Sequence, residues 1–170
     1  DNGGDKRLDE YSPWENEKYG GGEGDSYLEF IAETLKPFVD LNFRTLTDAK
    51  NTGLIGSSLG GLISHYGALK HPDIFGKIGV FSPAFWFSNS SFDFAKSHSN
   101  LKASKLFFLV GDEEGEDVIP DMEKMIEIMT QNGFQTKNQI LKIIPGGKHN
   151  EQLWLTNFKE AIAWLFENNK

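Results

Sequence analysis

The chain has 170 residues, a formal net charge of −8 at pH 7, 38% hydrophobic residues and no cysteine. This length fits a single domain, and the apolar content predicts a packed core rather than a disordered chain. The negative charge disfavours nucleic acid and anionic membranes as partners, because both attract basic surfaces. The lack of cysteine excludes disulfides, thiolate metal sites and a cysteine nucleophile, but leaves the compartment open between cytoplasm, periplasm and secretion.

The first quarter of the chain predicts a loop followed by a helix. Residues 1–24 are rich in polar residues and glycine, and we expect a loop that is most flexible at 20–24. Asp25 or Ser26 then suits the N-cap of a helix, which Pro37 would kink near its end. The apolar face expected for this helix comprises Tyr27, Phe30, Ile31, Thr34, Leu35 and Phe38.

The rest of the chain alternates short apolar runs with helical periodicities. Buried strands are expected at 54–55, 78–81, 106–110 and 140–144, and helices at 59–71, 119–131 and 153–167. The methionines of the second of these helices suit core positions, and Gly133 suits its C-cap. Alternating strands and helices predict a mostly parallel sheet between helical layers. We therefore expect an α/β fold of three layers, α/β/α, with residues 1–170 in one domain.

The most informative motif is G-x-S-x-G at 56–60, which lies between an apolar run and a helical pattern. This arrangement is typical of a nucleophile elbow, in which a sharp turn from strand to helix exposes a serine. The predicted nucleophile is Ser58, and the backbone N–H of Leu59 would donate to the oxyanion. Gly56 and Gly60 would leave room for the turn. The alternative is a glycine-rich turn without chemistry.

A histidine and a group of carboxylates follow two other predicted strands. The carboxyl ends of parallel strands share one edge of the sheet, so these groups should meet Ser58 there. His149 follows the last strand and is the predicted base, whereas His65 suits packing or the surface, and His71 and His98 suit a helix end and solvent. The order Ser, acid, His is that of α/β-hydrolase triads.

The acid must come from the run 111–117, which follows the third strand. Glu114 is favoured over Asp112, because it has more loop with which to turn back toward His149. The other carboxylates of this run suit solvated positions. Chemistry of this kind requires no cofactor and no metal ion.

Aromatic residues near the same edge of the sheet suit a wall for an acyl or aryl group. Phe85 and Trp86 follow the second strand, and Trp154 follows His149; Tyr11 and Trp14 could extend this wall. The competing interpretation is core packing. The expected partner is a small acyl, aryl or carbohydrate ester.

The chain resembles the esterase family of the α/β-hydrolase superfamily that includes esterase D-like, enterochelin esterase-like and feruloyl or acetyl-xylan esterase members. The resemblance lies in residues 7–15, 52–63, 81–87, the G-D-E-E segment and 146–154. It implies an α/β-hydrolase fold with Ser58 as nucleophile, His149 as base and an acid at the Gly111-x-x-Glu114 position. It also implies about a hundred further residues upstream, which hold the first strands of the sheet and a second oxyanion donor.

This resemblance leads us to expect the C-terminal portion of an esterase domain. Its sheet would have an exposed edge at the strand before Ser58, covered by the upstream half of the domain or by self-association. Ester hydrolysis by the 170-residue chain would be weak or absent. The alternatives are a non-catalytic carbohydrate-binding or interaction module on the same scaffold, or an inactive fragment of a longer esterase.

Overall fold

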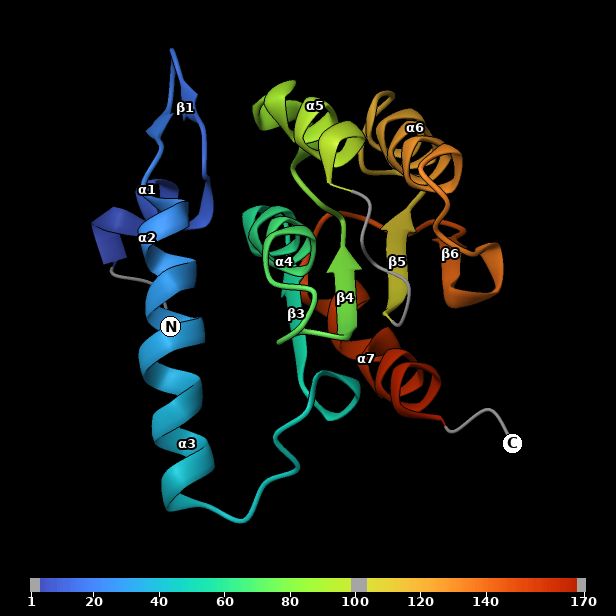
Figure 1. Ribbon diagram of the computed structural model, residues 1–170. Coiled ribbons are helices and arrows are strands. Elements are labelled where there is room, and N and C mark those ends of the chain that lie inside the picture. The colour runs from blue at the N-terminus through green and yellow to red at the C-terminus, as the bar shows by residue number, and fades with distance from the viewer. Residues whose placement is uncertain (1–3, 99–103, 168–170) are drawn as a thin grey trace.

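The computed structural model describes residues 4–98 and 104–167, and the elements below lie in these two ranges. Four parallel strands form one sheet in the order β3 (Gly53–Ser57), β4 (Lys77–Phe81), β5 (Lys105–Gly111) and β6 (Gln139–Ile144). The register pairs Ser57 with Phe81 and Phe81 with Leu109, so the carboxyl ends of these strands lie side by side. The predicted parallel sheet is confirmed (Figure 1).

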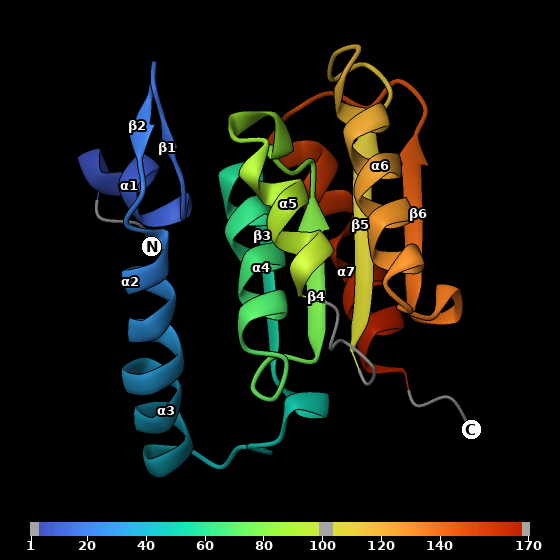
Figure 2. The same ribbon diagram turned by 45° about the horizontal axis from the view of Figure 1, so that its top comes forward.

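Helices cover both faces of this sheet and complete three layers. On one face, α4 (Leu59–Lys70), α5 (Ser90–Ser97) and α6 (Val118–Gln131) pack over a core that contains Val80, Phe108 and Met125. On the other face, α7 (Glu151–Phe166) packs against Phe107 and Leu109 (Figure 2). The side chains of β5 are buried on both faces, which is why this strand reads as a continuous apolar run. No helix of the two described ranges is long and apolar enough to cross a membrane.

The prediction of a loop over residues 1–24 is wrong from residue 4 on, where the structure has helical and strand elements. Residues 1–3 lie outside the described ranges. A 3₁₀ turn (Gly4–Lys6) leads into α1 (Arg7–Tyr11), and β1 (Glu15–Asn16) pairs with β2 (Gly20–Gly21) in a small hairpin. The cause is long-range packing: the indole of Trp14 lies edge-on to the rings of Tyr66 and Phe94. Such tertiary contacts leave no trace in local sequence patterns.

The following helix is correctly placed, but its expected cap and face are wrong. It runs through α2 (Gly24–Glu29), a π-helical turn (Phe30–Leu35) and α3 (Lys36–Asn42). Asp25 does not cap it, because its carboxylate accepts hydrogen bonds from Tyr66 and Lys70. Leu28 is buried, whereas Phe30 and Phe38 are 52% and 58% exposed. The π-helical turn ends two residues before Pro37, where the backbone must accommodate a residue without an N–H.

The helix α5 was not predicted, because its sequence is mostly polar. Its Phe92 and Ala95 are nevertheless buried.

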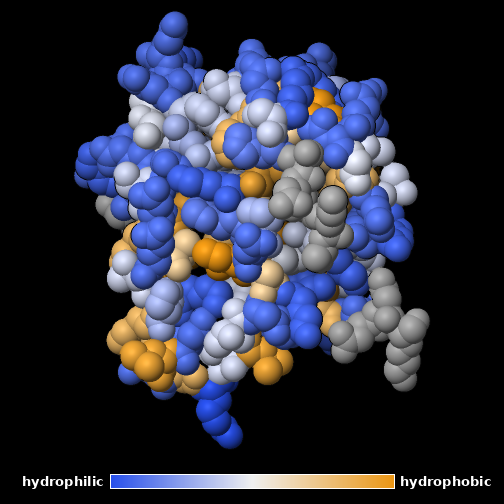
Figure 3. Space-filling view, viewed as in Figure 1, coloured by the Kyte–Doolittle hydropathy of each residue, from blue (hydrophilic) through white to orange (hydrophobic). Residues whose placement is uncertain are grey.

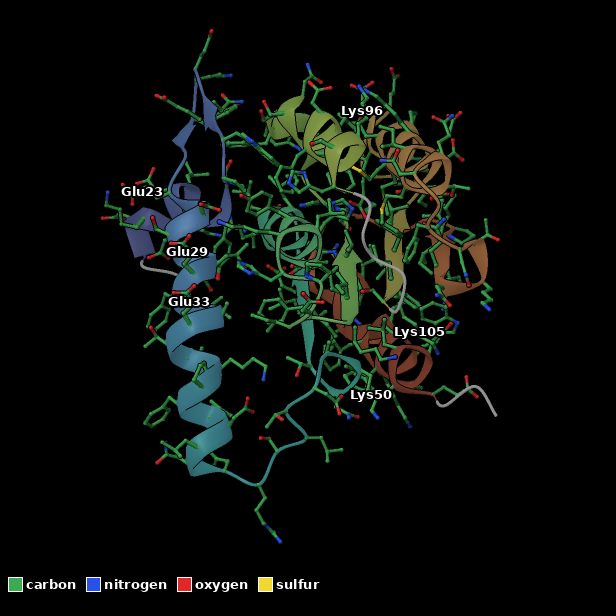
Figure 4. The ribbon with its side chains drawn as sticks, in the orientation of Figure 1. Glu23, Glu29, Glu33, Lys50, Lys96 and Lys105 are labelled. Atoms are coloured by element: carbon green, nitrogen blue, oxygen red, sulfur yellow. The ribbon has the colours of Figure 1, made fainter. Side chains whose placement is uncertain are left out.

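The C-terminus of α7 is held by a lysine from the start of β5 (Figure 4). Lys105 Nζ donates to the carbonyl oxygens of Trp164 and Glu167, at 3.1 and 3.0 Å. Both carbonyls lie at the helix end, where intrahelical donors are lacking.

The core contains a buried histidine, and this predicts a pH-dependent stability. His65 is 2% exposed, and burial lowers its pKa to about 3. In the unfolded chain the pKa of histidine is about 6.5, so between about pH 6.5 and pH 3 the unfolded chain binds a proton at His65 that the folded chain does not bind. Lowering the pH from 7 to 5 should decrease the free energy of unfolding, on the order of a few kcal/mol.

Urea unfolding at several pH values checks this expectation. His65→Leu should flatten the dependence of the unfolding free energy on pH between 7 and 5. His71→Gln serves as the comparison, because partial burial also lowers the pKa of His71 and gives it a share of the slope. An unchanged slope in His65→Leu would contradict the assignment.

Candidate active site

Ser58 lies on the sharp turn between β3 and α4, as the motif predicts. Its backbone has φ 58° and ψ −125°, a strained combination for a residue other than glycine. The turn is held on both sides: Ser58 N–H donates to the Phe81 carbonyl at 2.9 Å, and the Ser58 carbonyl accepts from the N–H of Leu62 at 3.1 Å and of Ala84 at 3.1 Å. The surrounding backbone therefore fixes the strained conformation.

The reason for glycine in the elbow differs between its two positions. A Cβ atom on Gly56 would lie 2.2 Å from the carbonyl oxygen of Gly60, so only glycine fits at Gly56. A Cβ atom on Gly60 would meet only the Tyr11 ring, at 4.0 Å. The expectation that Gly60 must lack a side chain to leave room for the turn is therefore wrong. The backbone of Gly60 packs against Gly56, and it is Gly56 that must lack a side chain.

Glu114 and His149 are in direct contact. The Oε2 atom of Glu114 lies 2.7 Å from Nδ1 of His149, as the sequence predicts for the favoured acid. The carboxylate of Glu114 is fully buried, while the His149 side chain is 42% exposed. Burial alone would raise the pKa of Glu114, but hydrogen bonds from His149, the Gly111 N–H and Ser82 outweigh it and hold the pKa below its usual value. Glu114 is therefore an ionised acceptor beside a partly exposed imidazole.

The loops that carry this pair touch each other through their backbones. A Cβ atom on Gly111 would lie 2.2 Å from the carbonyl of Gly147, so both positions exclude other residues. The N–H of Glu113 donates to the Gly147 carbonyl at 2.9 Å, and the N–H of Gly146 donates to Oδ1 of Asp112 at 2.7 Å. Asp112 thus holds the loop before His149 and does not contact the imidazole itself.

Ser58 and the Glu114–His149 pair share the carboxyl edge of the sheet, but the described residues include no hydrogen bond between Ser58 and His149. Side chains in catalytic sites without ligand often stand further apart than in the reacting complex. Leu59, the expected oxyanion donor, is the first residue of α4, so no preceding turn of this helix offers a carbonyl to its N–H.

The aromatic residues near the site have different surroundings. Phe85 is fully buried and packs against His65 and Phe92, so its place in an aromatic wall is wrong and the competing core interpretation holds. Trp86 is 57% exposed, and its ring lies 5.9 Å from the ring of Tyr19 in the β1–β2 hairpin.

Trp154 borders the acid–base pair rather than standing free. Its ring meets His149 edge-on at 5.2 Å, and its indole N–H donates to the hydroxyl of Ser82 at 2.8 Å. Sequence reasoning gave no role to Ser82. The signal that could have found it is its place directly after a buried strand, at the edge where Ser58 and Glu114 also lie.

The parallel sheet between helical layers, with a serine on the sharp turn after its edge strand, is the fold of the α/β-hydrolase class. A family model described as "Putative esterase" matches residues 1–165. The chain belongs to that family, which confirms the resemblance seen in the sequence.

Individual relatives agree with this membership. The chain is 30% identical over 179 residues to "Uncharacterized protein YbbA" of Bacillus subtilis (strain 168), covering 98% of the chain and 72% of YbbA. Among solved structures, the BES protein from Bacillus cereus superimposes with a TM-score of 0.80 at 20% identity, over 98% of this chain and 66% of that one. A CE1 ferulic acid esterase from Anaeromyces mucronatus superimposes with a TM-score of 0.68 at 22% identity, over 85% and 55%. The chain thus spans no more than about two thirds of these two structures.

Proposed function

We propose that the chain carries the catalytic residues of a serine carboxylic-ester hydrolase that acts through an acyl-enzyme. Ser58 is the nucleophile, His149 the base, Glu114 the acid and the Leu59 N–H an oxyanion donor. The observation that supports this most is the buried, ionised Glu114 on Nδ1 of His149, at the same sheet edge as the strained Ser58. Strained serines on tight turns and oriented histidines are the parts that this chemistry requires.

The proposed acylation begins when Ser58 Oγ attacks the carbonyl carbon of the ester and His149 Nε2 takes the hydroxyl proton. Glu114 stabilises the imidazolium that forms, because it stays ionised in its buried position. The oxyanion of the tetrahedral intermediate accepts a hydrogen bond from the Leu59 N–H. The intermediate then expels the alcohol, which receives the proton from His149, and leaves the acyl group on Ser58.

Deacylation repeats these steps with water in place of serine. His149 removes a proton from the water, the resulting hydroxide attacks the acyl carbonyl, and Ser58 leaves with the proton returned by His149. The products are a carboxylic acid, an alcohol and the free serine.

The substrate class we propose is a small ester with an acyl, aryl or carbohydrate part. A structural neighbour is described as a ferulic acid esterase, and ferulic acid is an aromatic acid. The exposed ring of Trp86, supported by Tyr19, offers a surface on which an aromatic group could stack. Trp154 would border the acyl carbon through its position beside His149.

Two measurements test the proposed function. The 170-residue chain should hydrolyse short-chain p-nitrophenyl esters, because Ser58, His149 and Glu114 all lie within it. A serine-directed fluorophosphonate should label one residue, and peptide mass analysis should place the label on Ser58. Labelling of another residue would mean that the nucleophile is wrongly assigned, and neither hydrolysis nor labelling would favour a non-catalytic module or an inactive fragment.

We also propose a partner at the free edge of the sheet, along β3. This edge is flanked by a mainly apolar hollow of about 560 Å³ between α3 and β3, and by a second of about 310 Å³ between α2 and β3 whose lining mixes apolar and polar residues. Large apolar side chains gather on α3 and the segment after it, including Phe38, Leu41, Phe43 and Leu46, and Figure 3 shows this patch at the lower left. Unpaired strand edges and apolar patches gain free energy when they are covered. The covering group is either a further part of the same domain or a second copy of the chain.

The 170-residue chain on its own should therefore self-associate. Sedimentation velocity over a range of concentrations should show dimers or larger species, because in the described ranges no strand pairs with the outer edge of β3. Phe38→Glu and Leu46→Glu should shift the population toward monomers, whereas Tyr19→Glu, on the distant hairpin, should not. A concentration-independent monomer in the unmodified chain would contradict the prediction.

A further inference from the structure

Two residues that the proposed chemistry does not use directly are connected to its acid. Ser82 follows β4 and is 1% exposed, and its φ of 43° is positive. Within the described residues, Ser58 and Ser82 are the two non-glycine residues with positive φ. Strain of this kind persists where the surroundings enforce it, and it is concentrated at functional sites. Ser82 N–H is fixed to the Leu109 carbonyl at 2.7 Å.

The side chain of Ser82 joins Trp154 to Glu114. Its hydroxyl donates to Oε1 of Glu114 at 2.7 Å and accepts the indole N–H of Trp154 at 2.8 Å. The indole nitrogen is only a donor, so it occupies an acceptor position of the hydroxyl. The single hydroxyl proton therefore points to Glu114. Trp154 thereby sets the direction of the Ser82–Glu114 hydrogen bond.

This direction determines how the two oxygens of Glu114 are used. Oε1 accepts from Ser82 and from the Gly111 N–H at 2.6 Å, and Oε2 is left for Nδ1 of His149. Two donors on Oε1 favour the ionised carboxylate, and an ionised Oε2 requires a proton on Nδ1. The proton-free nitrogen of a neutral His149 is then Nε2, the atom that must accept the proton of Ser58.

We propose that Ser82 and Trp154 are positioning residues that hold His149 in the Nδ1–H tautomer through the Oε1 atom of Glu114. The proposal rests on the proposed function for its catalytic meaning, but the tautomer itself is independent of activity. It also gives Trp154 a role besides bordering the substrate: its N–H acts through Ser82, and its ring limits the rotation of the imidazole.

The tautomer can be read directly in the 170-residue chain labelled with ¹⁵N. Long-range ¹H–¹⁵N spectra, taken where histidine is neutral and assigned with His149→Gln, should show the proton of His149 on Nδ1. In Ser82→Ala and Trp154→Phe, a several-fold larger fraction should carry it on Nε2. The double variant should resemble Ser82→Ala alone, because Trp154 acts through Ser82.

Matched controls separate this role from general packing. Ser91→Ala removes another buried hydroxyl, one with no hydrogen-bond partner among the described residues, and Trp164→Phe alters another tryptophan of α7. Both should leave the tautomer unchanged. Should Ser82→Ala not fold, Trp154→Phe alone decides, since it removes the N–H donor and keeps an aromatic ring, and Trp164→Phe makes the same change in size as its control. An unchanged tautomer in Trp154→Phe, or an equal change in the controls, would overturn the proposal.

Kinetics of the same variants link the tautomer to turnover. With p-nitrophenyl acetate, kcat should fall about tenfold in Ser82→Ala with KM nearly unchanged, because a hydrogen bond to the charged Glu114 is lost. In Trp154→Phe, kcat should fall about three- to tenfold, because the hydroxyl of Ser82 loses the donor that orients it. Ser58→Ala separates the proposed function from the proposed positioning role of Ser82 and Trp154. If it retains turnover, the proposed function fails, while the tautomer measurement still tests the positioning of His149.

Discussion

Replacing Ser58 by alanine should lower kcat for a short-chain p-nitrophenyl ester by at least about 10³-fold and abolish labelling by a fluorophosphonate. The substitution removes the only atom that forms the acyl-enzyme in the proposed reaction, and the loss of a triad nucleophile costs more than any single hydrogen bond. The fold should persist, since the backbone of the turn is held by Phe81, Leu62 and Ala84. Steady-state kinetics of ester hydrolysis measures the change in kcat, and mass spectrometry of the labelled peptides measures the loss of labelling.

The neighbouring serine provides the control for this substitution. Ser57 is the last residue of β3, and its backbone pairs with Phe81 in the sheet. Ser57→Ala should keep both the labelling and most of the turnover. If Ser57→Ala abolished labelling and Ser58→Ala did not, the nucleophile would be wrongly assigned.

Replacing Glu114 by glutamine should lower kcat by about 10²- to 10⁴-fold and leave KM nearly unchanged. The amide is close in shape to the carboxylate, and its oxygen can still accept from Ser82 and Gly111. Its NH₂ group would then face Nδ1 of His149, where two donors would meet. The imidazole would move its proton to Nε2, and Ser58 would lose its base.

Asp112→Asn is the matched control, because it makes the same change two residues earlier. Its amide oxygen can still accept the Gly146 N–H that Asp112 now binds. We expect less than about a threefold change in kcat. The reverse pattern would assign the acid to Asp112, and an equal, small effect of both would indicate catalysis by Ser58 and His149 alone. Steady-state kinetics over a range of pH distinguish these outcomes.

The parts of the fold that were predictable are those encoded in short, strongly apolar runs. The run 106–110 is buried on both faces of the sheet, and the methionines of α6 lie in the core. The hairpin before Gly24 and the exposed Phe30 and Phe38 were not predictable. Their positions depend on contacts with residues far along the chain, or on partners that cover them.

For the candidate site, the residue types and their order predicted Ser58 on a turn and Glu114 against His149. The place of Ser82 and the burial of Phe85 were not predictable, because both depend on how the segment after β4 turns between neighbouring elements. A serine after a strand reads as an ordinary loop residue until its left-handed backbone and its two hydrogen-bond partners are seen.

The contact between Gly111 and Gly147 has a consequence for motion. Glu114 and His149 are 35 residues apart along the chain, yet their loops are joined by two hydrogen bonds, from the Glu113 N–H to the Gly147 carbonyl and from the Gly146 N–H to the Asp112 carboxylate. Neither loop can open without breaking the bonds of the other, so the two should open as one cooperative unit and protect their amide hydrogens together. A pair that fluctuates as one body keeps its distance during every such motion. The imidazole and carboxylate thus need little rearrangement when charge develops between them.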